Sequence, residues 1–210
     1  MASVCTNRSP MPFNPRRTPP GTILGQDSQA GSYVLRIELR IVHQLAFGRF
    51  KKGKVINLEA GEYLYIGSAL GAGRSAATGL ARRLVRHASR ATDRPPHRIR
   101  AKLLDLFADH DLGPDNPLPT RPKTLFWNID HLLDLPKAHL VEVFALRSPQ
   151  RLEGPLGQIL EADSHTTVFE KGLGANDVPG NTHILHVAAP EAWWDALPAR
   201  IIQLAESHQG

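Results

Sequence analysis

The sequence predicts an α+β fold in which a small, mainly antiparallel sheet is flanked by helices. Three observations support this class. Residues 31–41 alternate apolar and polar side chains, as a strand does. Residues 78–90 repeat apolar side chains at helical spacing, and short strand-like and helix-like segments follow one another along the chain without an internal repeat. A chain of 210 residues is long enough for one domain with a substantial core.

The composition excludes several classes of protein. The apolar fraction of 41% and the charged fraction of 21% are those of an ordinary globular protein. No apolar run approaches the ~20 residues that span a bilayer, and the N-terminus lacks the layout of a secretory signal. The single cysteine, Cys5, excludes an internal disulfide and a cysteine-based zinc site. We therefore expect a cytoplasmic protein without membrane association.

The chain is predicted to have three parts. Residues 1–30 are rich in Pro, Ser and Gly and lack apolar periodicity, so we expect a disordered leader. Residues 31–187 are expected to form the domain. Residues 188–210 are expected to form a C-terminal helix that docks on the domain through Trp193 and Trp194.

The first expected strand lies within residues 31–41. Tyr33 and the apolar residues that follow it at every second position share one face. Arg36, Glu38 and Arg40 share the other face, so we predict a strand with one exposed side.

A second expected strand carries two tyrosines on one face. Residues 47–62 are rich in Gly and Lys and predict a loop with at most a short strand. In the segment "EYLYIG" that follows, Leu64 and Ile66 face one way and Tyr63 and Tyr65 the other. Because only turn signals separate the two strands, we expect them to pair in antiparallel fashion.

Residues 78–90 predict an amphipathic helix with a basic face. The apolar side is formed by Leu80, Leu84, Val85 and Ala88. Most of the opposite side is formed by Arg82, Arg83, Arg86, His87 and Arg90.

The remaining elements continue the alternation of helices and strands. We expect a helix at residues 98–110, a loop at 111–122, a strand at 139–146, a loop at 172–181, a strand at 182–189 and a terminal helix from residue 190. Ser148 followed by Pro149 has the pattern of a helix start. Pro155 would either kink that helix or mark a later start.

The positive charge is concentrated in one segment. Nine bases and one acid, Asp93, lie between Gly71 and Lys102, so this segment has a net charge of +8 and the rest of the chain −3. A local basic surface is typical of proteins that bind phosphate groups, whereas the alternative is a solvated arginine-rich helix. The residues expected to contact nucleic acid are Arg74, Arg82, Arg86 and Arg90.

Several motifs together resemble the GIY-YIG nuclease superfamily. "GSY" at residues 31–33, "YIG" at 65–67 and "RLVRH" at 83–87 occur in this order. The longer strings "YLYIGSALG", "FWNID" and "GLGANDVPGNTHILH" are similar to a domain-of-unknown-function branch of that superfamily, and the resemblance extends over residues 31–187. It implies a GIY-YIG-like fold and a metal-dependent endonuclease that hydrolyses phosphodiester bonds in DNA. One alternative is an inactive nucleic-acid-binding module with the same fold, and another is a basic helix that binds an acidic protein.

The resemblance also implies roles for four residues. Tyr33 is associated with activating the attacking water, and Tyr65 lies next to the scissile phosphate. A tyrosine that acts as a base requires a pKa lowered by a nearby cation. Arg83 matches the phosphate clamp, and His87 lies one helical turn later on the same face. The alternatives are a half-buried strand tyrosine, a solvated arginine and a boundary histidine.

A divalent metal ion, Mg²⁺ or Mn²⁺, is expected from the same resemblance. Glu153 occupies the place of the glutamate that holds this ion in the superfamily, and one carboxylate suits an ion that keeps much of its water. Glu161 is the alternative ligand, because Gly154 and Pro155 interrupt a regular helix.

Other residues are expected to line the site. They are Gly67, Ser68, Asp130, Asp177 and His183. For Asp177 and His183 the alternatives are a turn cap and a strand-edge partner. The chain departs from the superfamily at Ser32, Phe126 and Asn128, and it lacks the late-loop cysteines of many relatives.

Overall fold

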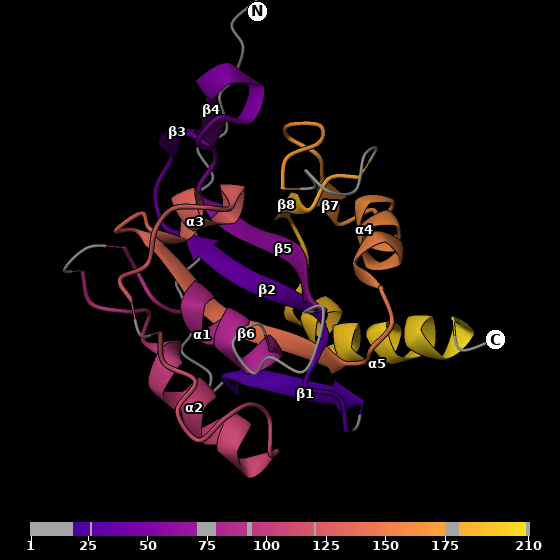
Figure 1. The fold of residues 1–210 in the computed structure, drawn as a ribbon. Coiled ribbons are helices and arrows are strands. Elements are labelled where there is room, and N and C mark those ends of the chain that lie inside the picture. The colour runs from indigo at the N-terminus through magenta and orange to yellow at the C-terminus, as the bar shows by residue number, and fades with distance from the viewer. Residues whose placement is uncertain are drawn as a thin grey trace, which may run out of the picture.

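The computed structural model describes residues 19–25, 27–70, 79–91, 94–119, 121–174 and 181–208. Its centre is a six-stranded sheet with the strand order β1-β6-β2-β5-β8-β7 (Figure 1). The strands are β1 (Gly21–Gly25), β2 (Gly31–Leu39), β5 (Gly61–Ala69), β6 (Ala138–Arg147), β7 (Thr166–Thr167) and β8 (Ile184–Val187). All neighbouring pairs are antiparallel except β1 and β6, which are parallel. The α+β class and the mainly antiparallel sheet are confirmed.

Helices cover both faces of this sheet (Figure 1). The helices are α1 (Leu80–His87), α2 (Ile99–Asp109), α3 (Asn128–Leu133), α4 (Glu153–Glu161) and α5 (Glu191–Ser207). The first three pack into one core cluster and the last two into a second cluster on the opposite face. Within the described ranges, no helix combines the length and the apolar character needed to cross a bilayer.

The predicted pairing of the two tyrosine-bearing strands is confirmed. Strand β2 pairs with β5 along its whole length in antiparallel register. Leu64 and Ile66 pack in the cluster with α4 and α5, whereas Tyr63 and Tyr65 pack in the cluster with the first three helices. The tyrosines therefore face α1, the helix that carries the basic residues.

The prediction that β2 exposes one polar face is wrong. Arg36 is only 8% exposed, because α5 covers that face of the sheet. Its guanidinium binds Glu62 at 2.6 Å and Glu191 at 2.8 Å, lies 3.4 Å from Glu142, and stacks 4.5 Å from the Trp194 ring centroid. A charged residue is tolerated in this buried position because each donor has an acceptor.

The chain becomes ordered earlier than the sequence predicts. Strand β1 lies within residues 1–30, and for this strand the prediction of disorder is wrong. Its residues pair with β6, from Gly21 opposite Val143 to Gly25 opposite Arg147. The partner strand is more than 100 residues away in the sequence, so the local composition of residues 1–30 cannot indicate this pairing. Residues 1–18 lie outside the described part of the chain.

Two further elements differ from expectation. The segment before β5 forms a second sheet from β3 (His43–Ala46) and β4 (Val55–Leu58), with the 3₁₀ helix η1 (Phe50–Gly53) between them. Helix α3 was not predicted. Both depend on packing against the rest of the domain, because each element is too short to be stable alone.

Helix α4 begins later than the Ser148-Pro149 pattern suggests. Its first residue is Glu153, and Pro155 lies in its first turn. An amide in the first turn has no acceptor within the helix, so the missing N–H of Pro155 costs little there. The later start places Glu153 at the N-terminal end of α4.

Candidate functional site

Three aromatic side chains from different elements meet on the α1 side of the sheet. The Tyr33 ring of β2 lies 6.1 Å from the Tyr65 ring of β5 and 5.5 Å from the His87 ring of α1, measured between centroids. The rings of Tyr65 and His87 are 5.8 Å apart. The structure thus brings together three of the four residues for which a catalytic role is expected.

Gly67 makes this close arrangement sterically feasible. It lies directly opposite Tyr33 in the β2–β5 pair. A Cβ atom at residue 67 would lie 2.5 Å from the Tyr33 hydroxyl oxygen and 2.6 Å from the ring carbon that bears it. The Tyr33 ring can lie flat against β5 only because residue 67 has no side chain.

Arg83, the fourth residue, lies beside the cluster. Its guanidinium stacks 4.1 Å from the centroid of the Trp127 ring, which in turn lies 5.8 Å from the His87 ring. Arg83 is partly exposed, and its charge favours the ionised form of Tyr33. Arg83 can therefore reach an anion that approaches the cluster from solvent.

The cluster itself is almost completely buried. Tyr33 is 2% exposed, Tyr65 6% and His87 0%. The helical pattern placed His87 on the solvated face of α1, but the structure buries it. Direct contact of a substrate with Tyr65 requires displacement of neighbouring groups.

Burial decides the protonation of Tyr33 and His87. Burial raises the pKa of Tyr33 well above its usual value, Tyr65 raises it further, and the opposing effect of Arg83 is smaller. Tyr33 therefore lacks the lowered pKa that a tyrosine acting as a base by itself requires. Burial also lowers the pKa of His87 well below its usual value, although Asp130 favours its protonation. At neutral pH, Tyr33 is a phenol and His87 is a neutral imidazole.

The hydrogen bond between Tyr33 and His87 has a defined direction. The Tyr33 hydroxyl lies 2.8 Å from His87 Nε2. The other ring nitrogen, Nδ1, lies 3.9 Å from a carboxylate oxygen of Asp130, which favours a proton on Nδ1. In that tautomer the Tyr33 hydroxyl donates and His87 Nε2 accepts.

Asp130 connects this cluster to two cations. It is fully buried, and its carboxylate accepts from Arg86 at 3.1 Å and lies 3.2 Å from Lys123 Nζ. The backbone amides of Phe126 and Trp127 donate to it at 3.0 and 2.9 Å. Burial by itself would raise the pKa of Asp130, but Lys123 and the other nearby cations more than offset it, so Asp130 stays ionised.

The arginines expected to contact nucleic acid differ in availability. Arg86 is engaged by Asp130 and by the Trp127 ring, whose centroid lies 4.2 Å from the guanidinium carbon. Arg90 donates to backbone carbonyls around the end of α3. Arg82 is partly exposed, and its Nε is buried without a hydrogen-bond partner in the described ranges. Arg74 lies outside the described residues.

Glu153 lies in a second polar group, formed with Ser68 and His183. Glu153 is 5% exposed; one carboxylate oxygen lies 3.1 Å from His183 Nδ1, and the other accepts from the Ser68 hydroxyl. Burial would raise the pKa of Glu153, but the interactions with His183 and Ser68 lower it on balance, so Glu153 is ionised. The negative charge of Glu153 is felt by Tyr33, since it contributes to the raised pKa of that phenol.

The other expected metal ligands are less suitable. Glu161 accepts a hydrogen bond from the Thr182 amide at 2.9 Å and is bound to the backbone there. Asp177 lies outside the described residues. No group of three or more His, Cys, Asp or Glu side chains within the described ranges is arranged to hold a metal ion. Glu153 is ionised, and its two carboxylate oxygens contact His183 and Ser68 inside the protein.

Sequence reasoning missed two residues of this region. Lys123 is 7% exposed and joins the site through Asp130. Phe126 is 76% exposed and packs edge-on against Trp127, with the ring centroids 5.4 Å apart. Phe126 is the first residue of the "FWNID" motif and was noted only as a departure from the superfamily, and Lys123 lies three residues before the motif.

The fold and the site define a class of protein: an α+β domain with a buried tyrosine–histidine cluster and arginines beside it. The family model described as Domain of unknown function DUF123 matches residues 32–205. This range covers most of the chain, so the protein belongs to the DUF123 family. The comparisons with curated proteins and with solved structures gave no match.

Proposed function

We propose that the protein is a metal-dependent endonuclease of the GIY-YIG type that hydrolyses phosphodiester bonds in DNA. The observation that carries this proposal is the meeting of Tyr33, Tyr65 and His87 in one cluster, with Arg83 beside it. Phosphodiester hydrolysis requires an activated water, cationic donors for the phosphate and a route for the proton. The cluster offers groups for each requirement.

The hydrogen bond between Tyr33 and His87 supports a proton relay. A phenol with a raised pKa is a poor base by itself. As the water attacks, its proton passes to the Tyr33 oxygen while the Tyr33 proton passes to His87 Nε2, so Tyr33 never becomes a free phenolate. The carboxylate of Asp130, 3.9 Å from His87 Nδ1, stabilises the imidazolium that forms.

The phosphate itself also favours this relay. A negatively charged phosphodiester next to His87 raises the pKa of the imidazole and makes it a stronger base. Arg83 is placed to hold the same phosphate with planar, paired N–H donors. Trp127 orients Arg83 through the stacking contact at 4.1 Å.

Glu153 is the residue that would hold the metal ion, with Ser68 as a neighbouring oxygen donor. An ion there would supply positive charge to the phosphate oxygens. Glu153 is ionised and lies close enough to affect the pKa of Tyr33, so the carboxylate and the relay belong to one region.

Plasmid nicking tests the proposal. Purified protein incubated with supercoiled plasmid and Mg²⁺ or Mn²⁺ is expected to produce nicked circles, and Tyr65→Phe is expected to lower the rate at least about 100-fold. Tyr63→Phe is a matched control on the same strand. The Tyr63 hydroxyl donates to the Glu59 carbonyl at 2.8 Å, away from the cluster, so this variant is expected to nick at the wild-type rate.

Two outcomes would contradict the proposal. Nicking that survives Tyr65→Phe would assign the activity to another site or to a contaminant. Equal losses in Tyr63→Phe and Tyr65→Phe would mean that strand β5 tolerates no change, and the role of Tyr65 would then have no support.

A second candidate is a nucleic-acid-binding module without turnover. The burial of His87 and Glu153, at 0% and 5% exposure, favours it, because both groups already have partners inside the protein. A wild-type protein that binds DNA but fails to nick it with either metal would establish this candidate instead.

A further inference from the structure

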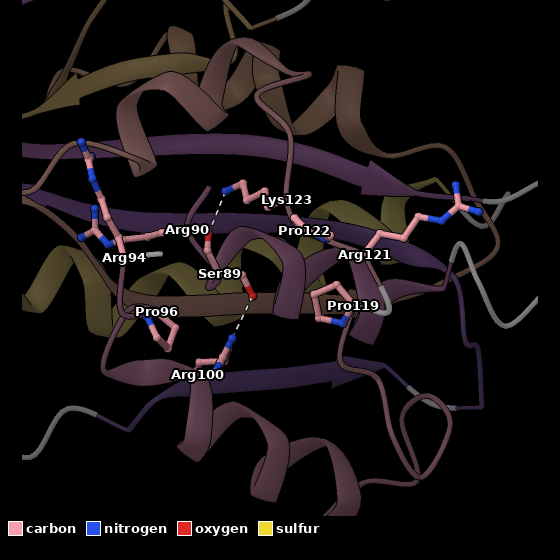
Figure 2. A pocket seen from close by; sticks show the side chains of 9 residues that line it. All are labelled: Ser89, Arg90, Arg94, Pro96, Arg100, Pro119, Arg121, Pro122 and Lys123. Carbon is pink, nitrogen blue, oxygen red and sulfur yellow. Dashed lines mark hydrogen bonds between the residues drawn. The ribbon is translucent and has the colours of Figure 1, made fainter. Parts of the chain in front are cut away.

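A hollow lined by basic side chains lies at the C-terminal end of α1 (Figure 2). Its volume is about 320 Å³, and its walls come from the segment after α1, the start of α2 and the loop before α3. The lining cations are Arg90, Arg94, Arg100, Arg121 and Lys123. None of the described lining residues is acidic.

Ser89 holds the walls of this hollow together. Lys123 Nζ donates to the Ser89 carbonyl at 2.9 Å, and Arg100 donates to the Ser89 hydroxyl at 3.3 Å (Figure 2). An isolated bridge between Ala91 and Lys123 ties the loop before α3 to the end of α1. The hollow is therefore formed by the fold before any ligand arrives.

Three of the five cations are already bonded inside the protein. Arg90 donates to the carbonyls of Leu133, Leu135 and Ala138, Arg94 pairs with Asp134, and Lys123 pairs with Asp130. Arg100 has only the long bond to Ser89, and Arg121 is exposed, with no ion pair to any described residue. Arg100 thus keeps free donors in the hollow, whereas Arg121, whose side chain extends away from Arg100, keeps free donors at its rim (Figure 2).

Mutual repulsion among these charges is visible in nearby groups. Burial lowers the pKa of Arg90; Asp134 opposes this lowering, and the charge of Arg94 adds to it. Burial lowers the pKa of His97 to about 3, with Arg90 and Lys123 contributing in the same direction. A bound anion would relieve this repulsion.

We propose that this face binds the nucleic-acid backbone, with Arg100 contacting a phosphate in the hollow and Arg121 contacting another phosphate of the same backbone at the rim. Planar guanidinium groups bind phosphate oxygens in pairs, and the volume admits a phosphate with its sugar. Lys123 of the hollow and His87 of the tyrosine cluster share Asp130, at 3.2 and 3.9 Å, so the hollow adjoins the candidate active site. This inference rests on the proposed function, because it places DNA on this side of the domain.

DNA binding by two matched double variants tests the inference. Arg100→Gln with Arg121→Gln removes two charges at the hollow. Arg98→Gln with Lys102→Gln removes two exposed charges of the same region that do not line it. Binding of a fluorescent 20-nucleotide DNA duplex and its single strand is measured by anisotropy, in EDTA, over a range of KCl concentrations.

The hollow variant is expected to bind about tenfold more weakly, with a salt slope flatter by about 2, since two phosphate contacts are lost. The control variant is expected to change less than about threefold. Equal weakening of the two variants, or unchanged affinity in the hollow variant, would overturn the inference. Arg121→Gln alone serves if the double variant does not fold, because Arg121 is exposed.

Two further comparisons distinguish this inference from binding of free phosphate and from the nuclease proposal. If millimolar inorganic phosphate stabilises the wild type while the hollow variant binds DNA normally, the hollow binds free phosphate and the inference fails. Because EDTA prevents metal-dependent hydrolysis, weakened binding in a protein that never nicks plasmid would support the hollow and contradict only the nuclease proposal. Nicking activity in the wild type together with unchanged DNA binding in the hollow variant would support the nuclease proposal and contradict the inference about the hollow.

Discussion

His97 is held in one protonation state by its two ring contacts. Its Nδ1 accepts a hydrogen bond from the Leu140 amide at 3.0 Å, so this nitrogen carries no proton. Its Nε2 lies 3.0 Å from the Leu133 carbonyl, to which it donates. Burial, followed by the charges of Arg90 and Lys123, lowers the pKa of His97 to about 3. An unfolded chain protonates this histidine near its ordinary pKa of ~6.5.

The pH dependence of stability follows from this difference. Between pH 6.5 and 3 the unfolded state binds one more proton at His97 than the folded state, so the free energy of unfolding rises with pH across this window. From pH 6 down to pH 4.5, His97 is expected to account for about 2 kcal/mol of lost stability. Urea unfolding at several pH values measures the loss.

The variant His97→Asn isolates this contribution. Asparagine offers an acceptor for the Leu140 amide and does not titrate, so the pH slope is expected to flatten by about one proton. His87 changes the pH dependence of stability in the same direction as His97. Glu142, whose pKa burial raises to about 7, changes it in the opposite direction. Both residues are present in the variant and in the wild type, so their effects cancel in the comparison. Parallel slopes for the variant and the wild type would show that His97 is not responsible.

Some properties of single residues in the candidate site follow from the local sequence, and others depend on distant segments. The shared face of Tyr63 and Tyr65 follows from strand alternation, which is a local property. The raised pKa of Tyr33 was not predicted, because it depends on how many other segments cover the ring. The same applies to Lys123, whose buried Nζ contacts Asp130 and the carbonyl of Ser89, which lies far away in the sequence.

At the scale of elements, Arg90 links α1 to the end of α3. Its guanidinium donates to the carbonyl of Leu133, the last residue of α3, where a helix leaves its C=O groups unpaired, and to the carbonyls of Leu135 and Ala138 beyond it. A cation at the C-terminal end of a helix also interacts favourably with the helix dipole. Arg90 therefore stabilises the domain, and its donors are already bonded within the protein.

Arg90→Ala is accordingly expected to lower the free energy of unfolding by about 3 kcal/mol, because several bonds from a charged donor are lost together. Arg94→Ala is the matched control. The Arg94 side chain is 47% exposed and pairs with Asp134 near the surface, so its loss is expected to cost less than about 1 kcal/mol. Urea denaturation measures both variants. Similar values for the two would show that the carbonyl contacts contribute little.

At the scale of the whole molecule, β1 closes one edge of the sheet. Its backbone pairs with β6, Leu24 packs in the α4–α5 core cluster and Ile23 packs against the other cluster. Edge strands that lose their neighbour expose unpaired N–H and C=O groups and tend to associate. The first strand is therefore part of the domain and not of a leader.

A chain that begins at Gly31 is expected to be less stable than one that begins at Pro19 by about 3 kcal/mol or more, since two apolar side chains lose their packing. It is also expected to associate at lower concentration through the free edge of β6. Urea unfolding and size-exclusion chromatography check the two effects, with the full chain as reference. Coinciding unfolding curves would mean that β1 adds nothing to the sheet.

The sequence by itself determined the parts of this protein that depend on near neighbours. The alternation in β2 and β5 and the apolar stripe of α1 follow from the geometry of one strand or one helix. Tertiary structure decided the parallel pairing of β1, the burial of Arg36 and His87, and the engagement of Arg90. These depend on segments that lie far away in the chain, and desolvation and charge pairing are set by such segments whatever the local pattern.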